Sequence, residues 1–491
     1  MKKVFLFAVA AAALVACSNE ELSTPDNVLT SKEAPVNFSV YTQRGLTRAG
    51  APGTIDNANI GTLGFGVFGY YTPGEAYDQK ATPNFMYNQR VTNDGQGWKY
   101  EPVKYWPNEF GSEAISDEVD RVSFFAYAPW TDVDPTTGNV VATTEKDQKY
   151  NIISVNKNTA TGDPIVKYVV DTNPATSVDL LWGVAADDAN TKYSAIGGNN
   201  VTVTAGKPFI DLVKPNDPVN DSLKFNLKHA LAKVKITIDY IVDDATPTPT
   251  ANPANKINSD QTRIYVRNFK MTGFAMKGAL NLNNNEGTAG EPLWKDFDGV
   301  KDLSFDEVVF QDGRKDGKEG ETNGAQTNET PQGLNPTIIE NYCAPTVDNS
   351  GKITGFGDKK SEGVTNTPKL LLGDGAYNPT SQTADTEGYF FVIPRNEGSS
   401  SVDVTIAYDV ETIDPALAGK LSDGETHGIS IENIISKSNI FNGIDFKAGF
   451  VYEIKIHLGM TSVKIEATVT DWVTGAKVDV ELPYNQTPAN P

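Results

Sequence analysis

The sequence predicts an all-β protein built from antiparallel β-sandwiches. Short segments alternate apolar and polar residues with a period of two, which places one face in a core and the other in water. These segments are rich in Val, Ile, Thr, Phe and Tyr, and clusters of Gly, Pro, Asn and Asp separate them. The clearest of them are 36–41, 201–204, 233–238, 402–406 and 452–456. This pattern is typical of antiparallel sandwiches rather than of a parallel α/β sheet.

Two other kinds of segment interrupt the strands. Helical periodicity is scarce in the chain, and the segment from Ile429 to Ile440 is the best candidate for a helix. Three stretches, 243–260, 312–335 and 374–387, are polar, contain Gly or Pro, and lack an apolar run. Because such stretches bury too little apolar surface to order themselves, we expect long loop insertions.

The first residues are typical of an exported protein. Lys2 and Lys3 precede an apolar run over residues 4–16, which is too short to span a bilayer but has the length of a signal-peptide core. The run ends in Leu-Val-Ala-Cys, which resembles a bacterial lipobox. We therefore expect residues 1–16 to be a signal peptide and Cys17 to carry the lipid. An ordinary signal peptide that ends near a cysteine is the alternative.

The residues after Cys17 predict the side of the membrane. Ser18-Asn19-Glu20-Glu21 is acidic and looks like the export tag of surface lipoproteins of Bacteroidales, although a plain solvated tether has the same composition. No later segment approaches ~20 consecutive apolar residues, so the lipid is the expected attachment to the outer membrane. The expected location is the cell surface.

Composition limits the partners and the domain organisation. The net charge of −21 argues against nucleic acid, whose phosphates need a basic protein face. If Cys17 is acylated, Cys343 has no cysteine to pair with, and we expect it to be a small buried side chain. The 491 residues suffice for two or three domains, and the prolines within 211–218 mark the best boundary. We expect sandwiches at 49–215 and 216–491.

No motif in the chain indicates catalysis, a cofactor or a metal site. Residues 64–69 spell GxGxxG, but their flanks predict a glycine-bearing strand with Phe65 and Val67 on one face. The three histidines form no HExxH pair, and no CxxC, GxSxG or P-loop sequence occurs. His229 precedes a strand, so we expect a hydrogen-bonded core histidine. We expect no enzyme activity.

Several short motifs together resemble the fimbrillin family of Bacteroidales, the type V pilins, over about residues 36–472. The motifs are Lys104–Pro107, Val122–Pro129, Val178–Gly183, Phe225–Val234, Phe390–Pro394 and Val463–Trp472. The resemblance implies two tandem transthyretin-like β-sandwich domains, and the long insertions depart from the shorter members. It also implies a structural subunit of cell-surface fimbriae that supports adhesion and has other fimbrial subunits as partners.

The resemblance further implies maturation by proteolysis. In this family a trypsin-like, Arg-specific protease cuts the lipidated precursor at the outer membrane. Arg48, followed by Ala49, looks closer to the family's processing site than Arg44 does, and two surface arginines in a loop are the alternative. Cleavage at Arg48 removes residues 17–48, which include the strand-like segment 36–41. The vacated strand position could then draw in a strand from another subunit.

A strand at or near the C-terminal end is a donor in the family. The candidate here is Ala476–Leu482, in which Val478, Val480 and Leu482 alternate as a donor strand requires. An ordinary last strand, paired within its own domain, is an equal alternative. The choice decides between a shaft subunit and a tip subunit, because a tip subunit accepts a strand without donating one.

Two other functions fit the same sequence. A surface glycan-binding lipoprotein that does not polymerise needs an exposed aromatic platform, for which Trp130 and Trp182 are candidates, although buried tryptophans are the default. A surface hydrolase needs a cleft with paired carboxylates, and the sequence does not place any two carboxylates together.

Overall fold

The computed structural model describes the greater part of the chain. The described residues are 35–42, 54–107, 120–141, 150–170, 177–186, 203–214, 222–240, 262–295, 304–305, 308–311, 338, 346–347, 349, 353–355, 363–365, 367–371, 389–394, 402–412, 429–437, 446–459, 463–471 and 477–478. The three expected insertions, at 243–260, 312–335 and 374–387, lie outside the described residues.

The described residues form β-strands and one short helix, α1 (Ile60–Leu63). The strands of the first half are β1 (Phe38–Thr42), β2 (Phe65–Pro73), β3 (Met86–Asn93), β4 (Trp98–Lys99), β5 (Asp120–Ala128), β6 (Ile152–Val155), β7 (Ile165–Val169), β8 (Leu181–Ala185), β9 (Phe209–Leu212) and β10 (Leu223–His229). Those of the second half are β11 (Ala232–Tyr240), β12 (Thr262–Thr272), β13 (Ala275–Asn281), β14 (Leu293–Lys295), β15 (Ser304–Phe305), β16 (Val308–Gln311), β17 (Thr346–Val347), β18 (Ile353–Gly355), β19 (Lys369–Leu370), β20 (Phe390–Val392), β21 (Asp403–Thr412), β22 (Ile429–Lys437), β23 (Phe450–Leu458), β24 (Val463–Asp471) and β25 (Lys477–Val478). The all-β prediction is confirmed.

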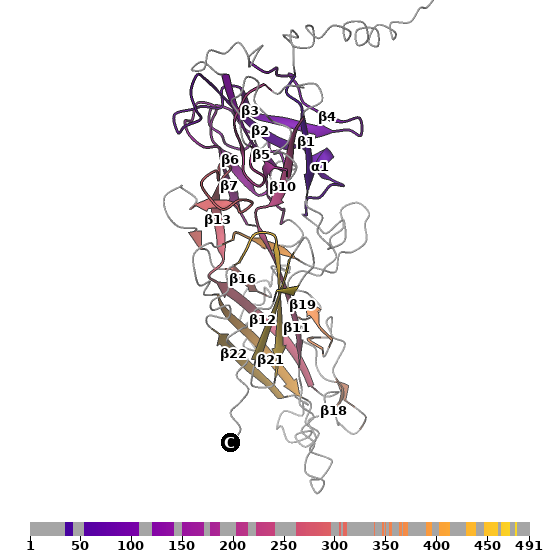
Figure 1. Cartoon of the computed structure of the whole chain (residues 1–491). Coiled ribbons are helices and arrows are strands. Elements are labelled where there is room, and N and C mark those ends of the chain that lie inside the picture. Colours follow the sequence, from indigo (N-terminus) through magenta and orange to yellow (C-terminus); the bar gives the residue numbers. More distant parts are fainter. Residues whose placement is uncertain are drawn as a thin grey trace, which may run out of the picture.

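The strands form four larger sheets in an elongated molecule (Figure 1). At one end, an 8-stranded sheet has the order β1-β10-β8-β5-β2-β3-β4, with β9 beside β5, and a 5-stranded sheet has the order β14-β13-β7-β6, with β15 beside β13. At the other end, a 6-stranded sheet has the order β19-β11-β23-β24-β25, with β20 beside β11, and a 4-stranded sheet has the order β16-β12-β21-β22. The two ends hold most of the first and second halves of the chain.

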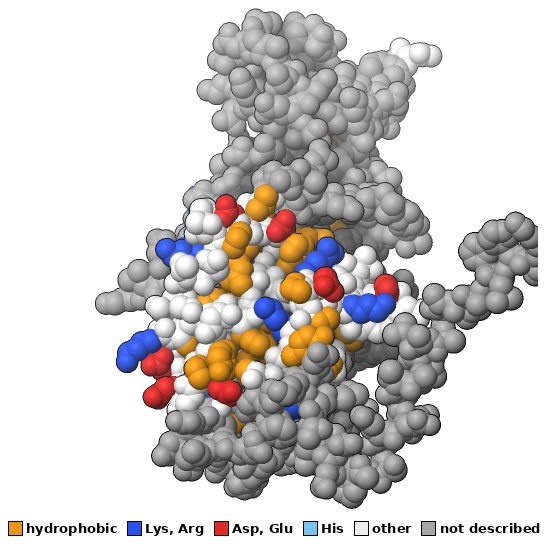
Figure 2. All heavy atoms as spheres, turned by 90° about the horizontal axis from the view of Figure 1, so that it is seen from above, with side chains coloured by type: hydrophobic (Ala, Val, Ile, Leu, Met, Phe, Trp, Pro, Cys, Tyr) orange, Lys and Arg blue, Asp and Glu red, His pale blue; other side chains and the backbone are white. Residues whose placement is uncertain are grey.

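The central strands of the 8-stranded sheet are buried on both faces. In β5, Val122, Phe124 and Ala126 belong to one hydrophobic cluster, whereas the intervening Phe125 and Tyr127 belong to another. The second cluster also contains residues of β6 and β7, so the 5-stranded sheet covers that face. Seen from above, this end of the molecule shows apolar side chains mixed with charged ones of both signs (Figure 2).

The glycines at the start of β2 have a steric role. Gly64 ends α1 with a positive φ of 76°, which favours glycine. At Gly66 an added Cβ would lie 2.5 Å from the Tyr127 ring, so a larger residue would displace that ring. Phe65 and Val67 share one buried cluster. The prediction of a glycine-bearing strand is confirmed.

The two sheets at the other end share a core that follows the predicted alternation. Ile236 in β11 and Ile454 in β23 are buried in one cluster with Phe269 in β12 and Ile406 in β21. Most strand pairs are antiparallel, as expected, but β1 runs parallel to β10 and β11 runs parallel to β23. The sequence does not indicate these two parallel pairings, because each joins strands far apart in the chain.

The predicted helix at Ile429–Ile440 is wrong. Residues 429–437 form β22, which pairs antiparallel with β21 and places Ile435 opposite Ile406. The segment Ile-Ser-Ile-Glu-Asn-Ile-Ile-Ser-Lys is rich in β-branched isoleucine, which favours a strand when a partner strand lies alongside. Tertiary pairing therefore outweighs the helical spacing.

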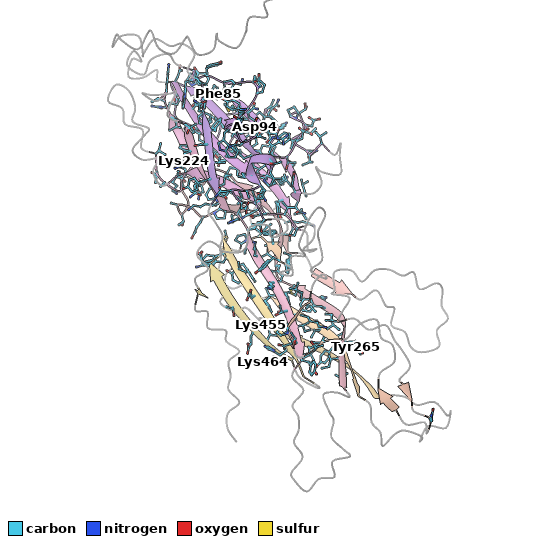
Figure 3. The ribbon with its side chains drawn as sticks, turned by 90° about the vertical axis from the view of Figure 1, so that its right-hand side faces the viewer. Phe85, Asp94, Lys224, Tyr265, Lys455 and Lys464 are labelled. Carbon is cyan, nitrogen blue, oxygen red and sulfur yellow. The ribbon has the colours of Figure 1, made fainter. Side chains whose placement is uncertain are left out.

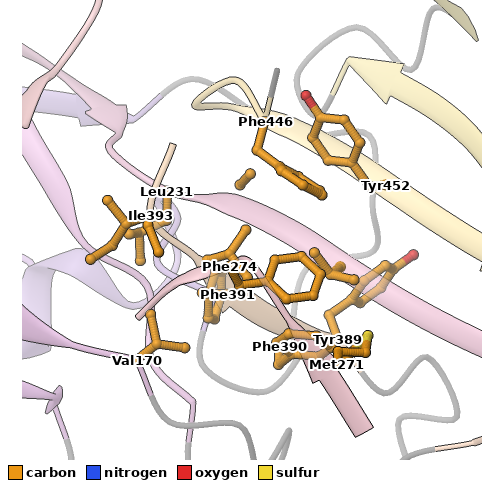
Figure 4. Packing of buried hydrophobic residues seen from close by; sticks show 14 of the residues in the cluster. Val170, Leu231, Met271, Phe274, Tyr389, Phe390, Phe391, Ile393, Phe446 and Tyr452 are labelled. Atoms are coloured by element: carbon orange, nitrogen blue, oxygen red, sulfur yellow. The ribbon is translucent and has the colours of Figure 1, made fainter. Parts of the chain in front are cut away.

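The connection between the two ends is buried. Ala230 and Leu231, which link β10 to β11, are both 0% exposed and lie in the hydrophobic cluster that extends into both ends (Figure 4). The Ala230 carbonyl accepts a hydrogen bond from Trp294 Nε1 at 2.9 Å, and the Leu231 carbonyl accepts one from the Gly449 N–H at 2.9 Å. The link is thus packed between segments of both halves.

The sheets favour a division between β10 and β11. β10 follows residue 215 in the chain, yet it pairs with β1 and β8 in the first sheet, and β13 pairs with β7. The tandem domains at 49–215 and 216–491 remain a proposal.

His229, at the end of β10, is 5% exposed, and its Nδ1 lies 2.7 Å from Asp179 Oδ2. The prediction of a hydrogen-bonded core histidine is confirmed.

Candidate functional site

Strand β1 occupies the outer position of the 8-stranded sheet, as the alternating segment 36–41 predicts. It pairs in parallel with β10 from Phe38 opposite Leu223 to Thr42 opposite Leu227. We call the surface that receives it the β1 seat: strand β10 together with Asn57 and residues 100–105. The expected processing sites follow β1 directly in the chain, so this seat is the candidate functional site.

The apolar side chains of β1 are part of the core. Phe38 is 5% exposed, and Val36, two residues before β1, is 0% exposed. The Phe38 ring centroid lies 5.5 Å from that of Tyr100, 5.7 Å from that of Phe124 and 6.1 Å from that of Phe225. Burying one such aromatic side chain contributes roughly 1.5–3 kcal/mol. Strand β1 therefore contributes to the hydrophobic core, although it lies at the edge of its sheet.

Residues 100–105 hold the start of β1. The Val36 N–H donates to the Lys104 carbonyl at 2.9 Å, and the Tyr100 hydroxyl donates to the Val36 carbonyl at 2.7 Å. Pro35 forms an isolated bridge with Tyr105. Burial raises the pKa of Tyr100 from 10.0 to about 12, so its hydroxyl keeps the proton that it donates further into the alkaline range. The fimbrillin-like motif Lys104–Pro107 thus lies against β1.

Asn57 holds the other end of β1. Its side-chain Oδ1 accepts a hydrogen bond from the Thr42 N–H at 2.8 Å, and its Nδ2 donates to the Thr42 carbonyl at 3.1 Å. One amide side chain therefore satisfies both backbone groups of the last residue of β1. This matters because Thr42 is buried at 2% exposure, where unpaired backbone groups are costly.

Most of the predicted site residues lie outside the described part of the chain. These are Cys17, Arg44, Arg48, Ala49, Val480 and Leu482. Val478 is described: it lies in β25, opposite Val469 of β24. The described pairing of β25 is thus with a strand of its own sheet, as the alternative of an ordinary last strand expects. The lipidation, cleavage and donor-strand assignments remain predictions.

Sequence reasoning missed the residues that hold β1. Tyr100 lies four residues before Lys104, close to a motif that the resemblance singles out, so the motif pointed to the correct region. Asn57 gives no comparable signal, because an asparagine in a Thr-Ile-Asp-Asn-Ala-Asn stretch reads as an ordinary turn residue. Its role depends on the tertiary contact with β1, which the local sequence does not indicate.

The glycan-binding alternative receives no support from the described tryptophans. Trp182 is 0% exposed, which confirms the default of burial, and Trp130 is half-buried beneath the Arg90 guanidinium, 4.7 Å from its ring centroid. In the described part of the chain no tryptophan is exposed. Within those same residues, no group of three or more His, Cys, Asp or Glu is placed to hold a metal ion. No helix there is long and apolar enough to cross a membrane.

Comparisons with known proteins place the chain beside fimbrial subunits. No family model matches it. Fimbrium subunit Fim1C of Phocaeicola vulgatus is 28% identical over 308 residues, which are 62% of this chain and 66% of the relative, so the match spans just under two thirds of that protein's length. A fimbrial protein from Bacteroides vulgatus has a TM-score of 0.48 at 16% identity, covering 89% of this chain and 99% of that one. The fimbrial anchor protein Mfa2 from Porphyromonas gingivalis has a TM-score of 0.28 at 9% identity, covering 90% and 98%. The similarity to Fim1C confirms the resemblance to the fimbrial proteins of Bacteroidales that the motifs predict.

Proposed function

We propose that this protein is a structural subunit of cell-surface fimbriae that supports adhesion. Two observations support the proposal. The chain is similar in sequence to a protein named as a fimbrium subunit, and β1 is an outer strand of its sheet that places Phe38 in the core. The second observation carries the mechanism, because it identifies what a cut after β1 could release.

The proposed maturation begins with a lipidated precursor. The lipid on Cys17 holds the chain at the outer membrane, where a trypsin-like, Arg-specific protease cuts after Arg48 or, less favourably, Arg44. Both arginines lie in the stretch between Thr42, the last residue of β1, and Thr54, where the described chain resumes. A cut there severs the covalent link between β1 and the chain that follows it. The lipid leaves with β1, so Cys17 serves as a temporary tether.

Loss of β1 leaves the seat ready to accept another strand. The outer backbone groups of β10 lose their partners, and an edge of unpaired N–H and C=O groups is a template for strand addition. Each buried group left unpaired costs about 1–3 kcal/mol. The apolar slot that held Val36 and Phe38 also opens to water. A strand supplied by another subunit pairs with β10 again and covers the apolar slot.

The proposed donor is the segment Ala476–Leu482 of another subunit. Val478, Val480 and Leu482 provide the alternating apolar face that the seat requires. Among the described residues, Lys477 and Val478 pair with Thr470 and Val469 of β24 in the same chain. In the proposed exchange this segment leaves β24 and pairs with the seat of a neighbouring subunit, which corresponds to a shaft position.

The test is protease-triggered polymerisation. Adding a trypsin-like protease to the lipidated precursor should give ladders of subunits that resist SDS, and the surface form should begin at Ala49. Replacing both arginines, Arg44→Ala with Arg48→Ala, should abolish the ladders. Arg121→Ala is the matched control, because Arg121 lies in the β2–β5 ladder and its loss should leave polymerisation intact. Ladders that persist in the double variant, or a surface form that begins at acylated Cys17, would refute the mechanism.

A further inference from the structure

Within the β1 seat, the polar face of β10 carries a row of hydrogen-bond donors. Leu223, Phe225 and Leu227 point into the core, so the alternating Lys224 and Asn226 lie on the opposite face, and Ser222 precedes them. Hydroxyl, ammonium and amide groups can all donate hydrogen bonds. Lys224 lies at the end of the molecule opposite to Lys455 and Lys464 (Figure 3).

Strand β1 uses this row incompletely. Ser39 lies with its Oγ 3.0 Å from Ser222 Oγ, and the Lys224 ammonium lies 5.3 Å from the ring centroid of Tyr41. Asn226 is 0% exposed, and among the described residues neither atom of its side-chain amide has a hydrogen-bond partner. A buried amide without a partner is costly and rare. The present occupant therefore matches the apolar slot better than it matches the polar row.

The pairing register of β1 and β10 indicates which residues a better-matched strand would have at positions 39 and 41. Residues that are opposite one another in a parallel pair share a face, and Ser39 lies opposite Lys224 while Tyr41 lies opposite Asn226. An acceptor at position 39 therefore meets the Lys224 ammonium, and one at position 41 meets the Asn226 amide. Carboxylates are the strongest acceptors for such donors, because hydrogen bonds that involve a charge are the stronger class.

The segment Ala476–Leu482 has this chemistry. If Val478, Val480 and Leu482 take positions 38, 40 and 42, Asp479 and Glu481 fall at positions 39 and 41. A shift by two residues would place Pro483 at position 41, where it lacks the N–H of a ladder residue. The unshifted register keeps this proline beyond the strand.

We propose that the β1 seat selects a strand from a second copy of this chain by two carboxylates, Asp479 opposite Lys224 and Glu481 opposite Asn226. The inference rests on the proposed function, since it requires that β1 leaves. It gives strand exchange a direction, because the incoming strand supplies an acceptor for the Asn226 amide, which has no hydrogen-bond partner among the described residues. The same row disfavours strands with neutral or basic residues at these two positions.

The test uses three fluorescent peptides of residues 476–482 and the full chain cut by a trypsin-like protease. The peptides are the native sequence, the neutral Asp479→Asn, Glu481→Gln form, and the basic Asp479→Lys, Glu481→Lys form. Anisotropy titrations should show that the native peptide binds about tenfold or more tightly than the neutral one, and that the basic one binds most weakly. The protein is identical in all three titrations, so misfolding cannot account for a difference.

Protein variants assign the selection to its residues. Lys224→Glu should reverse the order and favour the basic peptide, while Asn226→Ala should reduce the advantage of the native peptide over the neutral one without abolishing it. Lys235→Glu is the charge-matched control, because Lys235 lies on β11 beside Glu453 at 4.0 Å, and it should leave the order unchanged. Equal binding of the three peptides would overturn carboxylate selection while strand capture stands. Binding of none of them would overturn strand capture by the seat itself.

Discussion

Two outer strands of this molecule, β1 and β25, have opposite roles in the proposed strand exchange, since β1 leaves its seat and β25 is the donor. β1 pairs with β10 at five positions, places Val36 and Phe38 in the core region and is held at both ends by Tyr100 and Asn57. For β25, the described residues show Lys477 and Val478 paired with β24. The proposed exchange therefore begins with the release of a strand that is firmly held at both ends. A cut after β1 removes only its covalent link, so departure of the strand should be the slow step.

The largest expected effect separates the two strands by stability. Phe38→Ala should lower the free energy of unfolding by about 3–5 kcal/mol, because it empties a fully packed aromatic site. Val478→Ala should cost less, because a valine side chain carries less apolar surface into a core than a phenylalanine does. Urea unfolding of the uncut chain measures both. Equal losses would show that the two strands are held alike.

A smaller effect tests the groups that hold the ends of β1. Tyr100→Phe removes the hydroxyl that donates to the Val36 carbonyl, at a cost of about 1–2 kcal/mol. Release of the cleaved strand should then be about tenfold faster, which a fluorophore on the N-terminal piece would report. Tyr71→Phe is the matched control, because it loses a hydrogen bond to Asp120, away from the seat, and should leave the release rate unchanged.

The sequence predicted what is local and missed what is long-range. Alternation at 36–41, 233–238 and 452–456 located β1, β11 and β23, because period-two burial is written in adjacent residues. The helix prediction at Ile429–Ile440 is wrong, because pairing with β21 outweighs the helical spacing of the apolar residues.

The candidate site shows the same division. The motif Lys104–Pro107 pointed to the flank of β1, but neither the parallel pairing with β10 nor the unpaired amide of Asn226 has a sequence signal. Both arise where segments nearly two hundred residues apart in the chain come together. A resemblance to a family supplied the idea of a removable strand, and only the fold shows how firmly that strand is seated.

The smallest expected effect is a dependence of β1 release on alkaline pH. The ordinary pKa of a tyrosine is 10.0, and burial raises that of Tyr100 to about 12. A raised folded-state pKa means that the contribution of the neutral hydroxyl is fully present below pH 10 and is lost as the pH rises through 12. Ionised Tyr100 can no longer donate to the Val36 carbonyl, so release of cleaved β1 should quicken across this range.

Other tyrosines ionise in the same range, including Tyr71, whose pKa burial raises to about 12, so the informative quantity is a difference. The release rate of the parent chain should approach that of Tyr100→Phe as the pH rises from 10 to 12, because ionisation and substitution remove the same hydrogen bond. A constant ratio between the two rates over this range would mean that the Tyr100 hydroxyl does not hold β1. The pairing of β25 with Val469 and Thr470 involves no tyrosine among its described residues, so exchange limited by β25 would show no such convergence.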